Sequence, residues 1–152
     1  MKTYVKLLTT ALLFWGVVGA QTAAAETILV LVNKNNPVTE MSTEEIKSIY
    51  SGTKRFWDDG SKIKPLHMPP ESMEKEAFIT SVFKVSMSQY KLFWLSQKQT
   101  TGQTEPLSLH VSYPILNILS RKKEAIGYVS ARDYENLSDG IKTNLKTVKT
   151  LN

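Results

Sequence analysis

The sequence predicts an α/β domain in which a mixed sheet is covered by helices. Three observations support this fold class. A nearly continuous apolar run rich in β-branched residues, 27–32, indicates a buried strand. Apolar residues then recur at helical spacing between residues 42 and 119, and two strand-like runs, 125–129 and 145–151, lie near the C-terminal end. Strands interspersed with helices in this way are typical of layered α/β domains.

The first 25 residues are predicted to be a cleavable export signal. Lys2 and Lys6 precede a mostly apolar run of 14 residues, 7–20, and small residues follow at 23–25. That run is shorter than the roughly 20 residues that a membrane-spanning helix needs. Cleavage after Ala25 would leave one periplasmic domain, residues 26–152, with no membrane insertion. The less favoured alternative is a retained N-terminal anchor.

Composition narrows the functional classes further. The chain has 19 basic and 14 acidic residues and no cysteine. Signal cleavage removes two lysines and no acid, so the net charge falls from +5 to +3. This mild excess suits a small anion, but an exported protein of this kind is not expected to bind nucleic acid. Without cysteine there are no disulfides and no thiolate metal sites, so the domain depends on its hydrophobic core.

The first predicted strand, 27–32, is buried on both faces and is closed by the polar stretch 33–37. Ser42 and Glu45 have the spacing of a capping box, which predicts a helix that begins after Ser42 and runs to Tyr50.

The stretch Ser51-Gly52-Thr53-Lys54 has the composition of a phosphate-binding loop. Phosphate loops, however, place glycine before the N-terminus of a helix, whereas Gly52 follows one. We therefore expect Gly52 to end the helix in a left-handed conformation.

The middle of the chain predicts a short strand at 62–66, a loop at 67–71 and a helix capped by Ser72. A second capping box, Ser86 with Gln89, begins another helix. A polar loop at 100–106, a helix at 112–119, a strand at 125–129 and an edge strand at 145–151 complete the expected order.

In order and spacing these segments resemble the phosphate-binding proteins of ABC transporters, which have the type II periplasmic-binding fold. The resembling stretches are 32–37, 49–52 and 57–63, Ser72 with Phe78, Trp94, and 125–129. They span most of residues 33–129, which is little more than one of the family's two lobes. The resemblance implies a non-enzymatic receptor that binds an oxyanion such as phosphate and serves a transporter.

The resemblance also implies where a ligand binds. In the phosphate binders, the loop after the second strand carries an arginine and then Ser-Gly-Thr at a helix start. Here His67 lies near the place of the arginine, Ser72 keeps the serine, and Met73 and Glu74 replace glycine and threonine. The helix dipole favours an anion at this end. Ser72, Met73 and His67 are therefore candidate ligand-binding residues.

Simpler roles compete with these. Ser72 alone suffices as an ordinary N-cap, and His67 as a partly exposed loop histidine.

Lys34, Asn35 and Ser130 are further candidate ligand-binding residues. Lys34 and Asn35 follow the first strand, and Ser130 follows the strand at 125–129, in positions where open α/β sheets place ligands. For Lys34 and Asn35 an ordinary polar turn before Pro37 is an equal alternative.

No set of residues predicts catalysis, a cofactor or a metal. Asp58 and Asp59 precede a glycine and indicate a turn. His67, Met68 and Met73 suit copper(I) as ligand types, but they show no repeated spacing, and methionine more often fills gaps in cores.

A second functional hypothesis remains open beside the solute-binding one. A single lobe can act as an interaction module that docks an envelope protein without capturing a ligand. Two copies facing each other, as a homodimer, would restore a cleft.

Overall fold

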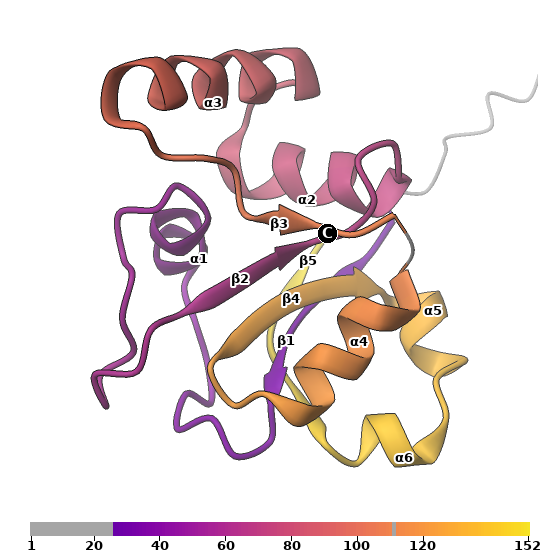
Figure 1. Cartoon of the computed structure of the whole chain (residues 1–152). Helices are drawn as coiled ribbons and strands as arrows, with labels where there is room; N and C mark the ends of the chain where they lie inside the picture. Colours follow the sequence, from indigo (N-terminus) through magenta and orange to yellow (C-terminus); the bar gives the residue numbers. More distant parts are fainter. Residues whose placement is uncertain (1–25, 111) are drawn as a thin grey trace, which may run out of the picture.

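The computed structural model describes residues 26–110 and 112–152, so the predicted signal peptide lies outside the described residues. Five strands form one sheet in the order β3-β2-β4-β1-β5 (Figure 1). Strands β3, β2 and β4 are mutually parallel, whereas β1 is antiparallel to both β4 and β5. The predicted mixed sheet is thus confirmed. Its strands are β1 Ile28–Asn33, β2 Lys64–His67, β3 Leu107–Ser108, β4 Ala125–Ser130 and β5 Leu145–Leu151.

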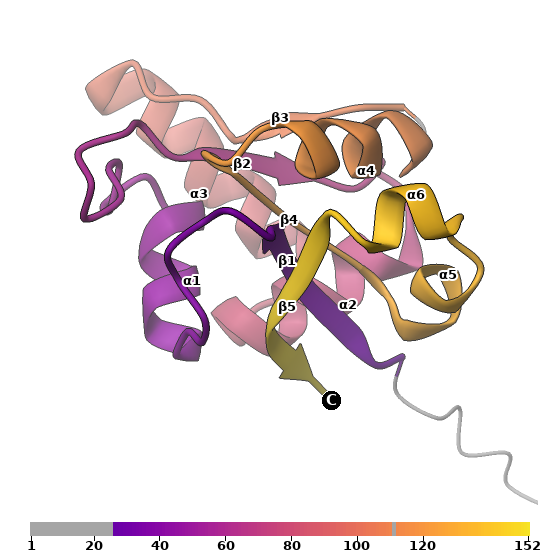
Figure 2. The same ribbon diagram turned by 90° about the horizontal axis from the view of Figure 1, so that it is seen from below.

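Helices cover both faces of this sheet, as Figure 1 and Figure 2 show from two directions. Neighbouring residues of β4 face opposite layers: Gly127 lies against Leu119 of α4, whereas Tyr128 stacks on Phe78 of α2. Strand β4 is therefore buried along its whole length. The helices are α1 Thr43–Tyr50, α2 Met73–Phe83, α3 Met87–Thr101, α4 Ser112–Arg121, α5 Ala131–Glu135 and α6 Asp139–Lys142.

The predicted helix boundaries are confirmed where side chains mark them. Ser42 and Ser86 each form a complete capping box, with Glu45 and Gln89 respectively. Ser72 caps α2 through its hydroxyl. Gly52 follows α1 with a φ of +76°, so the stretch around it ends a helix as expected.

Three short elements, β3, α5 and α6, are absent from the sequence-based prediction. They contain two, five and four residues, which is too short for a hydrophobic period to show. The second strand also differs, because pairing with β4 starts at Lys64 and the strand continues through His67. This shift moves His67 from the expected loop into the sheet.

Strand β5 is at the edge of the sheet, as predicted, but its side chains do not alternate strictly. Leu145, Val148 and Leu151 are buried, at intervals of three residues. The register with β1 shifts between Val30, which pairs with Lys149, and Leu31, which pairs with Thr147, so Val148 of β5 is the extra residue of a bulge. Because a bulge inserts an extra residue, it resets which side chains face the core.

Within residues 26–110 and 112–152, none of the helices combines the length and the apolar character needed to cross a bilayer.

Gly127 tests the packing of α4 on the sheet. A Cβ at this position would lie 2.8 Å from Leu119 Cδ1, in a fully buried layer. Gly127→Ala is therefore expected to lower the free energy of unfolding by about 1–3 kcal/mol through overpacking. The matched control is Gly140→Ala, where an added Cβ meets nothing within 4 Å. Urea denaturation compares the two variants, and equal stability of both would contradict the tight contact.

Candidate functional site

One end of the sheet gathers the features that could bind a ligand. Strands β2 and β4 run parallel, so their C-terminal ends meet at the same edge. Strand β1 is antiparallel to β4 and begins at this edge, with Ile28 opposite Ser130. Helix α2 starts shortly after β2 ends, and α5 starts directly after β4. Ser72, Met73 and Ser130 therefore belong to the same end of the domain.

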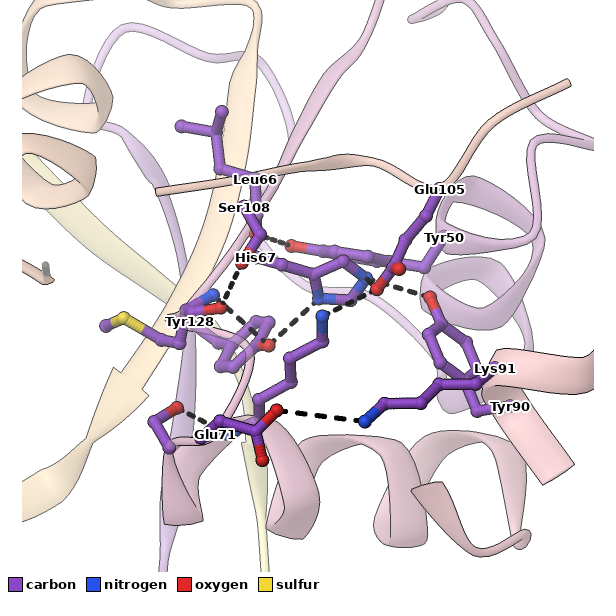
Figure 3. Close-up of polar contacts among 12 residues, drawn as sticks. Tyr50, Leu66, His67, Glu71, Tyr90, Lys91, Glu105, Ser108 and Tyr128 are labelled. Atoms are coloured by element: carbon purple, nitrogen blue, oxygen red, sulfur yellow. Dashed lines mark hydrogen bonds and ion pairs between the residues drawn. The ribbon is translucent and has the colours of Figure 1, made fainter. Parts of the chain in front are cut away.

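Ser72 has the conformation of an N-cap. Its Oγ accepts a hydrogen bond from the backbone N–H of Lys75 at 3.2 Å. Met73, the first residue of the helix, is exposed, and its side chain keeps 67% of its possible accessibility. A cavity of about 150 Å³ lies beside this helix start and is lined by Pro70, Glu71, Ser72, Glu76, Met87 and Lys91. Glu71 and Lys91 form an ion pair there, with Oε1 and Nζ 3.8 Å apart (Figure 3).

Carboxyl groups surround the start of α2. Burial raises the pKa of Glu74, and a hydrogen bond to Asp133 and the nearby charge of Glu26 raise it further. These groups come from three elements that meet at this edge: α2, α5 and the segment before β1. At neutral pH such negative charge opposes an incoming anion, whereas the helix dipole favours it.

Ser130 is almost completely buried. It is the N-cap of α5, where its Oγ accepts the backbone N–H of Asp133 at 3.1 Å. Its hydroxyl thus stabilises a helix start next to the candidate site.

Lys34 and Asn35 lie at the opposite end of the sheet, because β1 ends where β4 begins. The Lys34 amide donates to the carbonyl of Asn144, just before β5. The Asn35 amide donates to Asn33 Oδ1 at 3.0 Å, which closes a local turn. Both side chains are exposed. The structure therefore does not bring Lys34 and Asn35 together with Ser72, and the turn alternative describes their geometry.

His67 corrects the sequence-based expectation of a partly exposed loop histidine. It is the last residue of β2 and has no solvent exposure. Its Nδ1 lies 2.9 Å from the Tyr128 hydroxyl and its Nε2 lies 2.8 Å from the Tyr90 hydroxyl (Figure 3). Burial lowers the pKa of His67 well below its usual 6.5, and the charge of Lys75 lowers it further. The imidazole is neutral, so it supplies no positive charge for a ligand.

Two ionic residues near His67 were missed by sequence reasoning. Lys75 of α2 is buried, and its Nζ lies 2.6 Å from Glu105 Oε1, on the segment between α3 and β3. Lys75 precedes Phe78, Ile79 and Val82 by three, four and seven residues, so it lies on the apolar face of α2. That spacing was the available signal for a buried lysine.

Comparisons with known proteins place the chain in a family. Residues 15–152 match the model of the PBP superfamily domain. The chain belongs to this family. A search of curated proteins finds no significant match.

Solved structures share the fold. An ABC-type phosphate transport receptor from Vibrio cholerae superposes with a TM-score of 0.59 at 16% identity, over 82% of this chain and 46% of the receptor. A protein described as a phosphate ABC transporter substrate-binding protein with bound phosphate, from Clostridium perfringens, gives a TM-score of 0.57 at 22% identity, over 82% and 44%. PstS from Borrelia burgdorferi superposes with a TM-score of 0.53 at 15% identity, over 82% of this chain and 47% of PstS.

The chain spans slightly less than half the length of these solved structures, which fits one lobe of the fold. The family and the single-lobe architecture that the sequence predicted are thus confirmed. In this PBP superfamily domain the segment from β2 to α2 runs from a neutral buried His67 to Glu74, whose pKa is raised.

The buried His67 makes stability depend on pH. An imidazole that stays neutral in the folded state but has a pKa of about 6.5 when unfolded contributes full stability above pH 6.5 and loses it as the pH falls. Between pH 7.5 and 5.5 we expect a loss of about 1.4 kcal/mol, measured by urea denaturation. The raised pKa of Glu74 acts in the opposite direction, so the Glu74→Gln variant is measured as well.

A direct control follows the imidazole itself. His110→Gln leaves His67 as the only histidine, so one set of imidazole resonances reports its ionisation by NMR. These resonances should stay constant from pH 7.5 to 5.5. A titration centred near pH 6.5 would show that His67 is accessible, contrary to its burial.

Proposed function

We propose that this PBP superfamily domain is an exported, periplasmic solute-binding lobe that takes a small oxyanion of the phosphate type at the start of α2. The observation that carries the proposal is the position of this helix start. Ser72 caps it at the edge where β2 and β4 end, beside a cavity of about 150 Å³. Open α/β sheets bind ligands at such edges. Similarity to phosphate receptors supports the choice of ligand class.

Backbone amides and one hydroxyl supply the donors in this proposal. The amides of Met73 and Glu74 lie in the first turn of α2, where the helix dipole provides about half a positive charge. Lys91 of α3 lines the same cavity and adds an ammonium group. Glu71 and Glu74 oppose the ligand, and His67 is neutral. We therefore expect weak binding that strengthens at low pH, as Glu74 loses its charge.

The same proposal makes the chain a non-enzymatic component of a transport system. Its structural relatives are described as transport receptors or substrate-binding proteins. A single lobe leaves one side of its ligand in water, which weakens the electrostatic attraction. A transporter or a second lobe that covers the ligand would restore it.

Substitutions at the helix start test the site. We expect Ser72→Ala to weaken binding of sulfate and phosphate by about 2–10-fold, the range of one hydrogen bond. Glu74→Gln should strengthen binding severalfold at pH 7.5, because it removes an opposing charge. Isothermal titration calorimetry measures both. The pH dependence of binding is measured with sulfate, because the charge of sulfate itself does not change between pH 7.5 and 5.5.

Glu44→Gln is the matched control, since Glu44 occupies the same second helical position in α1 that Glu74 occupies in α2. It should leave binding unchanged. If neither the wild type nor Glu74→Gln gives saturable heat at millimolar anion, the solute-binding proposal fails.

A second candidate function, the interaction module, is favoured by the surface of α3. Leu92 and Leu95, three residues apart on this helix, keep 64% and 52% of their accessibility, and Phe93 beside them is also exposed. Helix α3 lies outside α2 (Figure 1), where its far side is free in the described chain. Exposed apolar groups of this kind favour a protein partner, and a second copy of the chain is the partner we propose.

Sedimentation equilibrium tests this candidate. We expect a concentration-dependent dimer that Leu92→Lys dissociates by at least tenfold in Kd, because a charge would be buried in the interface. Leu107→Lys, at an exposed leucine of β3, is the control and should leave the dimer intact. A monomer at every concentration would reject self-association.

A further inference from the structure

Lys75 is a cation that is buried in the part of the chain that the structure describes, and its burial needs an explanation. It is the third residue of α2, and its side chain keeps only 4% of its accessibility. An ammonium group removed from water is strongly destabilising unless an anion compensates it. The fold therefore requires a negative charge at this point.

Glu105 supplies that charge from a distant part of the chain. Its Oε1 lies 2.6 Å from Lys75 Nζ and 3.8 Å from His67 Nε2. The Glu105 side chain retains 31% of its accessibility, so it reaches the buried ammonium from the surface. Figure 3 shows its carboxylate pointing toward His67 and Tyr90. The carboxylate thus occupies a site whose other walls come from α2, β2 and α3.

The hydrogen bonds around His67 leave the hydroxyl proton of Tyr90 unused by the imidazole. Tyr128 accepts the backbone N–H of Met68, so its own proton is best placed on His67 Nδ1. His67 then carries its proton on Nε2 and donates it to the Tyr90 oxygen. Burial, together with the charge of Glu105, raises the pKa of Tyr90, so the phenol stays protonated. In this arrangement the Tyr90 proton remains available to an anion on the Glu105 side.

The segment that carries Glu105 is held by few other contacts. It begins after Gly102, which ends α3 with a φ of +72°, and leads into the two-residue strand β3. Beyond the two residue pairs with β2, Ser108 Oγ donates to the Met68 carbonyl at 2.6 Å. The acid is therefore presented on a short, irregular connection, whereas the groups that receive it belong to regular elements.

We propose that Lys75, with Tyr90 and His67, forms an internal anion-binding site for one small monocarboxylate, and that Glu105 fills this site as the chain's own ligand. The site does not rest on the proposed binding at Ser72: that helix start is at the surface, whereas the Lys75 side chain is buried. A single ammonium balances a single negative charge, so a carboxylate of the size of acetate or formate fits better than a phosphate dianion.

Removal of the internal carboxylate tests the site. Glu105→Ala leaves Lys75 without its partner and opens the space of the lost side chain. We expect the Tm of this variant to fall by about 10 °C in chloride. Addition of about 200 mM sodium acetate should raise it by about 5 °C relative to sodium chloride of equal ionic strength, because acetate binds the folded state. The wild type, in which Glu105 competes, should show no such difference.

Three control variants separate the site from general salt effects. Glu124→Ala breaks the surface pair with Lys64, whose side chain is exposed, and should show no acetate effect. Glu105→Gln fills the same space without charge, so acetate should raise its Tm by less than it raises the Tm of Glu105→Ala. Glu105→Ala combined with Lys75→Met removes the ammonium and should lose the acetate response.

If Glu105→Ala does not fold in chloride, the test measures the folded fraction that acetate recovers, by near-UV circular dichroism, and this result still decides the proposal. An acetate effect equal to that of chloride, or equal in Glu105→Ala and Glu124→Ala, would overturn the proposal. Because phosphate and Ser72 are not involved, this result is independent of the solute-binding test.

Discussion

The two hydrogen bonds of the buried His67 ring join three parts of the chain that are far apart in sequence. They connect the end of β2 to Tyr128 in the middle of β4 and to Tyr90 on α3. Phe78 of α2 stacks on Tyr128, with ring centroids 3.9 Å apart. Tyr90 also packs against Phe83 of α2, with ring centroids 5.0 Å apart. The polar centre and this contact therefore both hold α3, and with it the surface that carries Leu92.

This centre also determines where positive charge is available. His67 is neutral because it is buried between two hydroxyl groups, and Lys75 is compensated by Glu105. The excess of basic residues in the composition is therefore not concentrated at the edge where we propose that the ligand binds. What remains there is the partial charge of the α2 dipole, Lys91 and the exposed Arg132 of α5, which lies 4.0 Å from Glu26. Glu71 and Glu74 oppose these positive charges. A lobe of this kind would bind an anion weakly by itself, which is consistent with a need for a covering partner.

Local sequence signals predicted the architecture well. Capping serines and the helix-ending Gly52 depend on groups only a few residues away, so their roles follow from the order of residues. The buried strands also follow from their own composition. In contrast, α5 and β3 are too short to produce a period, and the bulge beside Val30 depends on pairing with β5. Such features follow from the packing of neighbours rather than from their own residues.

The sequence by itself determined a layered α/β domain of one lobe, its helix starts and the candidate helix at Ser72. Only the tertiary structure decided the state and the neighbours of the charged groups. His67 looks like a loop residue in the sequence, and for Lys75 only its place on the apolar face of α2 indicates burial. The partners that make their burial possible, Tyr90 and Glu105, come from elsewhere in the chain. The antiparallel direction of β1 likewise separates Lys34 from Ser72, since strand direction is set by pairing across the sheet and is not encoded in a single strand.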